Sequence, residues 1–138
     1  MKKPRKETKM LKVLPIQTKE EQAHVCALCN SSYNADLLAY AVYDDDTLLG
    51  VCQFRLTANG GEIHCLDSAD GTSRSDALFI MGRGALNFID LCGVHYAKYL
   101  GEVKNVDLLT AIGFKKNEYG IYDIDLNGFF TDHCGNHK

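Results

Sequence analysis

The chain has 138 residues, of which 46% are hydrophobic and 24% charged, and its formal net charge at pH 7 is −3. These are ordinary values for one globular domain with a single core, and the acidic balance argues against a nucleic-acid surface. No apolar run approaches the roughly 20 residues that a membrane span needs, and no signal-peptide core follows the N-terminal charges. We therefore expect a cytoplasmic protein that binds neither nucleic acid nor a membrane.

The N-terminal residues 1–9 carry five Lys or Arg and one Glu without apolar periodicity, which predicts a disordered basic tail. Folded pattern starts at residue 10, so we expect one domain over residues 10–127 and a flexible tail over residues 128–138. A first strand over residues 10–16 is interrupted by Pro15 and should lie near a sheet edge. Thr18 and Glu21 form a capping box for the helix that follows.

That helix is predicted to bury one face, which consists of Ala23, Cys26, Ala27 and Asn30. Next, residues 38–43 and 48–56 form a hairpin, and the turn Ala58-Asn-Gly-Gly61 leads into a strand over residues 61–67. The three strands should run as an antiparallel meander.

The strand over residues 61–67 feeds a loop, Ser68-Ala-Asp-Gly-Thr-Ser-Arg-Ser-Asp76, and then an amphipathic helix with Leu78, Met81, Ala85, Phe88, Ile89 and Cys92 on its apolar stripe. Unpaired backbone N–H groups and the positive end of the helix dipole meet at this loop, which suits a phosphate. The alternative is a loop that binds nothing, in which Asp76 caps or charge-balances the helix. The loop is neither a Walker loop nor a dinucleotide fingerprint.

After Gly93, residues 94–100 should form a strand that returns parallel to the 61–67 strand through the helix. A short helix over residues 103–112 is stopped by Gly113, and residues 114–117 lead through a turn into a final strand over residues 119–126. The predicted class is α/β (α+β): a mixed, mostly antiparallel sheet of about six to seven strands with about three helices.

The cysteines carry two interpretations. Cys26-x-x-Cys29 together with Cys134-x-x-His137 has zinc-ligand spacing. The simpler interpretation is that free cysteines pack as small hydrophobes in a reducing compartment, and on it we expect no metal. It covers the five cysteines that fall within patterned elements: Cys26, Cys29, Cys52, Cys65 and Cys92.

The order of elements resembles the GNAT superfamily of acyl-CoA-dependent N-acyltransferases, as a divergent short member. The stretch Leu108-Leu-Thr-Ala-Ile-Gly-Phe114, followed by Tyr119-Gly-Ile-Tyr-Asp-Ile-Asp-Leu126, looks like the family's last helix, its Gly-Phe junction and its final strand. The resemblance covers about residues 10–127.

This resemblance implies a sheet splayed between its two central strands, with acetyl-CoA as co-substrate in the cleft. The pantetheine arm would pair with the backbone of Leu66, Asp67 and Ser68, and the pyrophosphate would lie on the next loop. The implied cofactor-binding residues of that loop are Gly71, Thr72, Ser73, Arg74, Ser75 and Asp76. The family's usual loop is Arg/Gln-x-x-Gly-x-Gly/Ala, whereas this chain reads Asp70-Gly-Thr-Ser73-Arg-Ser75, with serine at both glycine positions.

Many family members protonate the leaving thiolate with a Tyr in the last helix, but the matching Leu109-Thr-Ala-Ile contains none. The candidates for a general base are His64, Glu62 and Asp67. Strand alternation places Glu62 and His64 on one face and Asp67 on the other. His95, Tyr96, Tyr119 and Tyr122 are further candidates on their chemistry alone.

Two functional hypotheses follow. The leading one is an N-acetyltransferase that moves an acetyl group from acetyl-CoA to a primary amine, and the alternative is a catalytically inactive GNAT-like domain that senses a ligand or binds a protein. The resemblance implies that the segment between the first two strands shapes the acceptor site. That segment is short here, which indicates an open site for a peptide or a small polyamine. The apolar final strand could pair across a homodimer.

Overall fold

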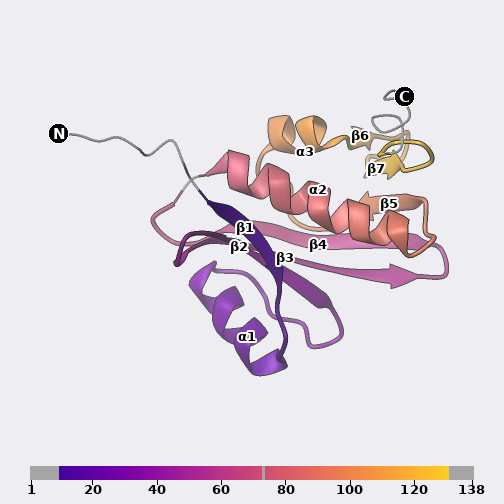
Figure 1. The fold of residues 1–138 in the computed structure, drawn as a ribbon. Coiled ribbons are helices and arrows are strands. Elements are labelled where there is room, and N and C mark those ends of the chain that lie inside the picture. The colour runs from indigo at the N-terminus through magenta and orange to yellow at the C-terminus, as the bar shows by residue number, and fades with distance from the viewer. Residues whose placement is uncertain (1–9, 73, 131–138) are drawn as a thin grey trace, which may run out of the picture.

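The computed structural model describes residues 10–72 and 74–130. These residues form one seven-stranded sheet in the order β1-β2-β3-β4-β5-β7-β6, with three helices (Figure 1). The predicted fold class is confirmed. The strands are β1 (Leu11–Pro15), β2 (Leu38–Asp44), β3 (Thr47–Thr57), β4 (Gly60–Ser68), β5 (Tyr96–Tyr99), β6 (Lys115–Lys116) and β7 (Tyr122–Asp125), and the helices are α1 (Lys19–Leu28), α2 (Ser75–Leu91) and α3 (Val106–Ile112).

The sheet separates two apolar clusters, with α2 on one face and α1 on the other (Figure 1). The α2 face carries the larger core, which includes Phe54, Leu66 and Phe114. As predicted, α2 buries Leu78, Met81, Ala85 and Ile89. Cys92 is exposed rather than part of this stripe, because α2 ends at Leu91 and Cys92 is its C-cap.

On the opposite face, α1 begins as predicted, with the Thr18 side chain accepting a hydrogen bond from the Glu21 N–H at 3.0 Å. The predicted buried face of α1 is right at Cys26 and wrong at its other members. The helix buries Gln22, Val25 and Cys26, and its C-cap Cys29 is buried too, whereas Ala27 and Asn30 are exposed and Ala23 is half-buried. Apolar periodicity missed this face because one of its central members is a glutamine.

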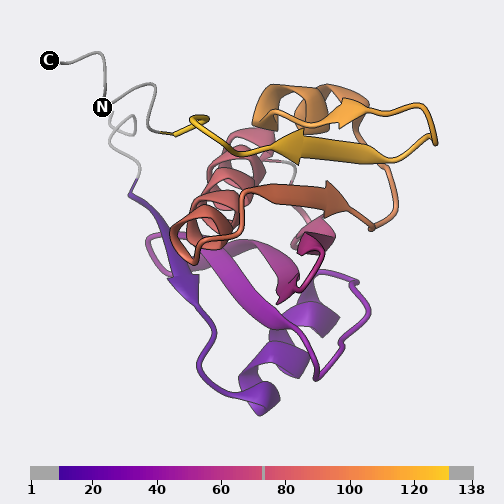
Figure 2. The ribbon, with the colours of Figure 1, turned by 90° about the vertical axis from the view of Figure 1, so that its right-hand side faces the viewer.

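Among the residues that the structure describes, the only parallel strand pairing joins β4 to β5, and it is short. It comprises three pairs, Gly61–Ala97, Glu62–Lys98 and Ile63–Tyr99, and the Leu100 N–H then donates to the Ile63 carbonyl at 2.7 Å. β5 ends at Tyr99, whereas β4 continues to Ser68. Figure 2 shows β5, β7 and β6 together in the upper half of the molecule, with β1 to β3 below them.

The C-terminal elements differ from their predicted limits. α3 starts at Val106 rather than residue 103, because the Asn105 side chain caps it by accepting from the Leu108 N–H at 3.0 Å. Residues 115–116, predicted as part of a turn, form the edge strand β6. The final strand β7 lies between β5 and β6. β6 pairs with only Tyr122 and Asp123 of β7, so the pairing of the final strand across a homodimer stays a prediction.

Candidate functional site

A β-bulge in β4 determines which side chains face the site. Gln53 pairs with Cys65 and Phe54 pairs with Ile63, so His64 is an extra residue in β4 without a partner on β3. The bulge changes the alternation, and Cys65 joins the α1-side cluster while Leu66 joins the α2-side core.

The predicted separation of His64 from Asp67 is therefore wrong. The Asp67 carboxylate accepts a hydrogen bond from the hydroxyl of Ser31, which follows α1. His64 and Asp67 also line the same cavity. One inserted residue brings the two candidate bases to one face of the sheet.

A first cavity, of about 560 Å³, opens where β4 continues beyond the end of β5. Its wall includes the end of β4, the loop that follows, and the facing parts of β5, α3 and the segment before α3. These residues are Cys29, Asn30, Leu66, Asp67, Ser68, Ala69, Asp70, Gly71, Thr72, Ser75, Leu78, Tyr99, Lys104, Asn105, Leu108 and Leu109. The Ala69 N–H donates to Leu49 of β3, so by alternation the backbone groups of Leu66 and Ser68 point away from β3, toward the cavity.

The loop between β4 and α2 combines an open backbone with small polar side chains. Gly71 has φ +81°, and no atom lies within 4 Å of the place where its Cβ would be. The Thr72 hydroxyl donates to the Ala69 carbonyl at 2.9 Å, and Ser75 opens α2 on the cavity wall. The predicted ligand Ser73 lies outside the described residues.

The electrostatics of this loop are dominated by acidic groups. Arg74 is not on the cavity wall, because its guanidinium donates to both carboxylate oxygens of Asp76, at 3.0 and 3.1 Å, and to Asp44 at 3.4 Å. The hydrogen bonds to Asp76 raise the pKa of Arg74 above its ordinary value. Asp70 lines the cavity and is exposed. An anion bound here would thus depend on backbone N–H groups and hydroxyls, since Arg74 is already neutralised.

A second cavity, of about 530 Å³, lies on the α1 side and meets the first. The segment between α1 and β2 supplies half of its lining residues: Asn30, Ser31, Ser32, Tyr33, Asn34, Ala35 and Leu37. The rest consists of Gln53, His64, Cys65, Asp67, Tyr99, Glu102 and Lys104. Four residues line both cavities, namely Asn30, Asp67, Tyr99 and Lys104.

Asp67 is the central charge at this junction and is only 8% exposed. One of its carboxylate oxygens accepts a hydrogen bond from the Ser31 hydroxyl and the other accepts from the Lys104 ammonium, each at 2.6 Å. The hydrogen bond to Asp67 raises the pKa of Lys104. Lys104 thus spans the gap between the end of β4 and the segment that follows β5.

A second group of charges lies beside it on β4. His64 Nε2 is 2.9 Å from Glu62 Oε1, and Arg55 Nε donates to the same oxygen at 2.9 Å. The hydrogen bond with His64 is the largest cause of a lowered pKa at Glu62. With Glu62 accepting from Nε2–H, the Nδ1 atom of His64 is available as an acceptor. Glu62 itself is not on the wall of the second cavity, so it acts on this site through His64.

Sequence reasoning missed Tyr99, Gln53 and Lys104. The Tyr99 side chain is 7% exposed at the junction, and its hydroxyl donates to the Glu102 carbonyl at 2.8 Å. Burial is the main cause of its raised pKa, so the phenol stays protonated at neutral pH. The sequence signal that could have pointed to Tyr99 is its position as the last residue of β5, the strand that pairs with β4 and ends before it.

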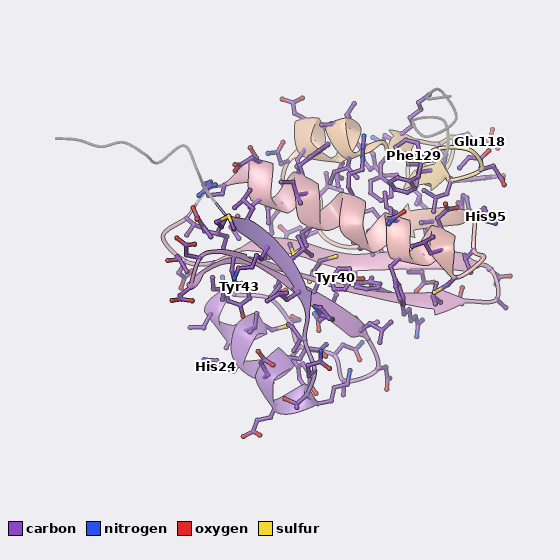
Figure 3. The ribbon with its side chains drawn as sticks, in the orientation of Figure 1. His24, Tyr40, Tyr43, His95, Glu118 and Phe129 are labelled. Atoms are coloured by element: carbon purple, nitrogen blue, oxygen red, sulfur yellow. The ribbon has the colours of Figure 1, made fainter. Side chains whose placement is uncertain are left out.

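The remaining aromatic and imidazole candidates lie elsewhere. His95 contacts Asp90 at 2.6 Å, at the end of α2 where the chain turns into β5 (Figure 3). The Tyr96 hydroxyl donates to Asp123 at 2.8 Å, and Tyr119 is 79% exposed. None of His95, Tyr96, Tyr119 and Tyr122 lines either cavity.

No protein-family model matches the chain, and neither does any curated protein. Solved structures do match it. The ribosomal-protein-S18-alanine N-acetyltransferase from Escherichia coli aligns over 85% of this chain and 94% of its own, with 9% identity and a TM-score of 0.65. The PaiA N-acetyltransferase from Thermoplasma acidophilum, in complex with coenzyme A, aligns over 84% and 99%, with 11% identity and a TM-score of 0.64. The spermidine N-acetyltransferase from Vibrio cholerae aligns over 88% of this chain and 97% of its own, with 12% identity and a TM-score of 0.65.

The chain has the GNAT fold. The parallel pairing of β4 with β5 stops after three residue pairs, at the place where the sequence resemblance implied a splayed sheet, and residues near this end line both cavities.

No group of three or more His, Cys, Asp or Glu among residues 10–72 and 74–130 is arranged to hold a metal ion. Cys26 and Cys29 are free, buried thiols, and their predicted zinc partners Cys134 and His137 lie outside these residues. None of the described helices is long and apolar enough to cross a membrane.

Proposed function

We propose that this protein is an N-acetyltransferase that moves an acetyl group from acetyl-CoA to a primary amine. The observation that carries the proposal is that two cavities beside the end of the β4–β5 pairing share Asp67, Tyr99 and Lys104 in their walls. Two reactants that enter from opposite sides would meet there in a fixed orientation, which is a large part of catalysis in such transfers. The solved N-acetyltransferase structures that share this fold support the same reaction class.

Acetyl-CoA would occupy the first cavity. Leu66 and Ser68 would offer backbone groups to the amides of the pantetheine arm, and the pyrophosphate would lie on the loop from Gly71 to Ser75, at the N-terminus of α2. Because Arg74 is held by two carboxylates and Asp70 adds a negative charge, we expect weak binding, in the upper micromolar range on the order of 100 μM.

The amine would enter through the second cavity. His64 would take its proton at Nδ1, with Glu62 holding the imidazole in the required tautomer. The amine would then attack the thioester carbon, and a β4 backbone N–H would stabilise the oxyanion. Tyr99 would protonate the departing thiolate, since its hydroxyl group belongs to a side chain that lines both cavities, and its raised pKa makes it a weaker acid than a free phenol. This assignment supplies from β5 the acid that the last helix lacks.

The alternative is a domain that binds the cofactor without turnover. The observation that favours it is the charge of the loop between β4 and α2. Arg74, the only arginine of this loop, is neutralised by Asp76 and by Asp44 of β2. Retained affinity for CoA, together with no release of free CoA from acetyl-CoA in the presence of any amine, would select this second function.

The test is calorimetry with acetyl-CoA and CoA, followed by a thiol-release assay with a panel of amines. Ser75→Glu should abolish binding, since it places a carboxylate beside the pyrophosphate. Tyr119→Glu adds the same charge in the exposed turn before β7 and should bind like the parent. Asp70→Asn should tighten binding about three- to ten-fold by removing a nearby negative charge. No binding at millimolar ligand would overturn both functions.

A further inference from the structure

The ammonium group of Lys104 lies where an acceptor amine would have to react. It donates to Asp67 Oδ1 at 2.6 Å, and both residues line both cavities. Asp67 is more than nine-tenths buried, and its other oxygen is already held by the Ser31 hydroxyl at 2.6 Å. The two side chains therefore form a built ammonium site, with one carboxylate oxygen directed at a single cation.

Lys104 holds this site only loosely. It comes from the irregular segment between β5 and α3, and its side chain is 52% exposed. Ion pairs with so exposed a partner contribute little to stability, because water and salt screen them and a long side chain loses rotamer freedom. Another primary ammonium of similar shape can therefore displace Lys104 from Asp67 without disturbing the core.

The walls of the second cavity disfavour an anionic guest. Its carboxylates are Asp67 and Glu102, and its only basic side chains among the described residues are Lys104, which is engaged with Asp67, and His64, which is engaged with Glu62. The rest of the wall consists of hydroxyl, amide, phenol, thiol and apolar groups. A guest with a second positive charge would meet Glu102, whereas a carboxylate would meet repulsion from it.

We propose that Asp67 is the subsite for the acceptor's ammonium group and that Lys104 occupies this subsite until the acceptor displaces it. The acceptor is then a small, unbranched alkylamine that matches a lysine side chain, with a neutral or cationic far end. A second consequence is that Lys104 itself is acetylated when acetyl-CoA is bound without an acceptor. This inference rests on the proposed transferase function.

The self-reaction balances without any further reactant. One proton leaves Lys104 Nζ for the solvent through Asp67, and the freed lone pair forms the N–C bond to the acetyl carbonyl. The C–S bond then breaks and its electron pair goes to sulfur, while the nitrogen gives up a second proton, which sulfur takes up to form free CoA. The product is an uncharged acetamide that no longer pairs with Asp67 as a cation. Asp67 raises the pKa of Lys104 and so lowers the fraction of free amine, but it also holds Nζ beside both cavities, and we expect this positioning to outweigh the loss.

The first test needs no knowledge of the acceptor. The full chain is incubated with acetyl-CoA alone, and acetylation is followed by intact mass and peptide mapping, with the exposed Lys115 and Lys116 as internal controls. We expect Lys104 to react at least ten-fold faster than either control, and we expect Asp67→Asn to remove that advantage. Equal rates at the three lysines, or an unchanged advantage in Asp67→Asn, would overturn the inference.

The second test compares acceptors of one chain length: 1,4-diaminobutane, butylamine and 4-aminobutanoate. Turnover should fall in that order, with 4-aminobutanoate inactive because its far end is a carboxylate. Lys104→Met should lower KM for 1,4-diaminobutane about two- to five-fold, the range expected from losing one half-exposed ion pair that competes with the substrate, while Lys104→Arg keeps the pair and should not. A higher KM in Lys104→Met, or a preference for 4-aminobutanoate, would overturn the inference. Calorimetry on the same samples separates the two failures, since absent acetyl-CoA binding would reject the transferase function itself.

Discussion

The wall of the second cavity is held in place by one buried glutamine, Gln53 of β3, which is 1% exposed. Its side-chain N–H donates to the Ser32 carbonyl at 2.7 Å. Its side-chain oxygen accepts from the Asn34 N–H at 3.1 Å and from the Gln22 amide at 2.9 Å. These bonds connect the centre of the sheet to the segment between α1 and β2. Replacing Gln53 with Leu should therefore release that segment while keeping a side chain of similar size.

The magnitude follows from these three lost hydrogen bonds, because the fourth, from the side-chain N–H to Cys65 Sγ at 3.6 Å, is weak. Gln22 retains contacts at 3.3 Å with the carbonyls of Asn34 and Leu37, so its amide is not left unpaired. The Ser32 carbonyl and the Asn34 N–H lie beside the cavity, where water can replace part of what they lose. At about 1 kcal/mol for each bond, Gln53→Leu should destabilise the protein by about 3 kcal/mol.

The assay is urea unfolding followed by far-UV circular dichroism, since the chain contains no tryptophan. With a slope of about 2 kcal/mol/M, the midpoint should fall by about 1.5 M. Gln17→Leu makes the same exchange at an exposed position and should change stability by no more than about 0.5 kcal/mol. The affinity for acetyl-CoA should stay within about two-fold of the parent, and KM for an amine should rise. Equal midpoints in the two variants would refute the reasoning.

Three further outcomes are expected. Arg83→Met should lower the free energy of unfolding by about 1–2 kcal/mol, because Arg83 donates to the Ile112 carbonyl at 2.6 Å and lies 4.9 Å from the Phe129 ring centroid; an unchanged melting temperature would contradict this. The lowered pKa of Glu62 means that its stabilising contribution is present above the unfolded-state pKa of about 4.3 and is lost as the pH falls through the lower folded-state pKa. Glu62→Gln should accordingly be less stable than the parent at pH 6 and equal to it near pH 3, and a difference that grows toward pH 3 would reverse the sign. In a Cys134→Ser background, a thiol reagent at neutral pH should label Cys92 first, because burial raises the pKa of the Cys29 thiol to about 12; rapid labelling of a buried thiol would show that α1 opens.

The topology could be predicted because local signals separate its elements clearly. Thr18 caps α1, and the Asn-Gly-Gly turn before β4 and Gly113 after α3 mark where elements end. A strand, a long amphipathic helix and a second strand then require a crossover, and chirality leaves few arrangements of it. The predicted limits of the elements were less accurate where a helix cap decides them. Because Asn105 caps α3, the helix starts three residues later than predicted.

The site could be predicted only in part, because its geometry depends on tertiary contacts. The pairing register that creates the bulge at His64 is set by β3, so strict alternation misplaced Asp67. Gln22 and Gln53 are buried because they satisfy each other, and neither looks apolar in the sequence. Lys104 is an ordinary surface residue until the fold brings it to Asp67.

The bulge has a consequence for how insertions and deletions act on this sheet. Cys65, Leu66 and Asp67 face as they would in a regular strand that had one residue fewer. A chain that lacked His64 would therefore keep the same core and the same carboxylate at the junction, and would lose only an imidazole. By the same logic, an inserted residue elsewhere in β4 would turn Leu66 out of the core. His64 is thus the one position in this strand whose presence the packing does not require. Natural sequences with this sheet can be compared for whether they keep a residue at this position. Its retention would indicate selection for chemistry rather than for stability.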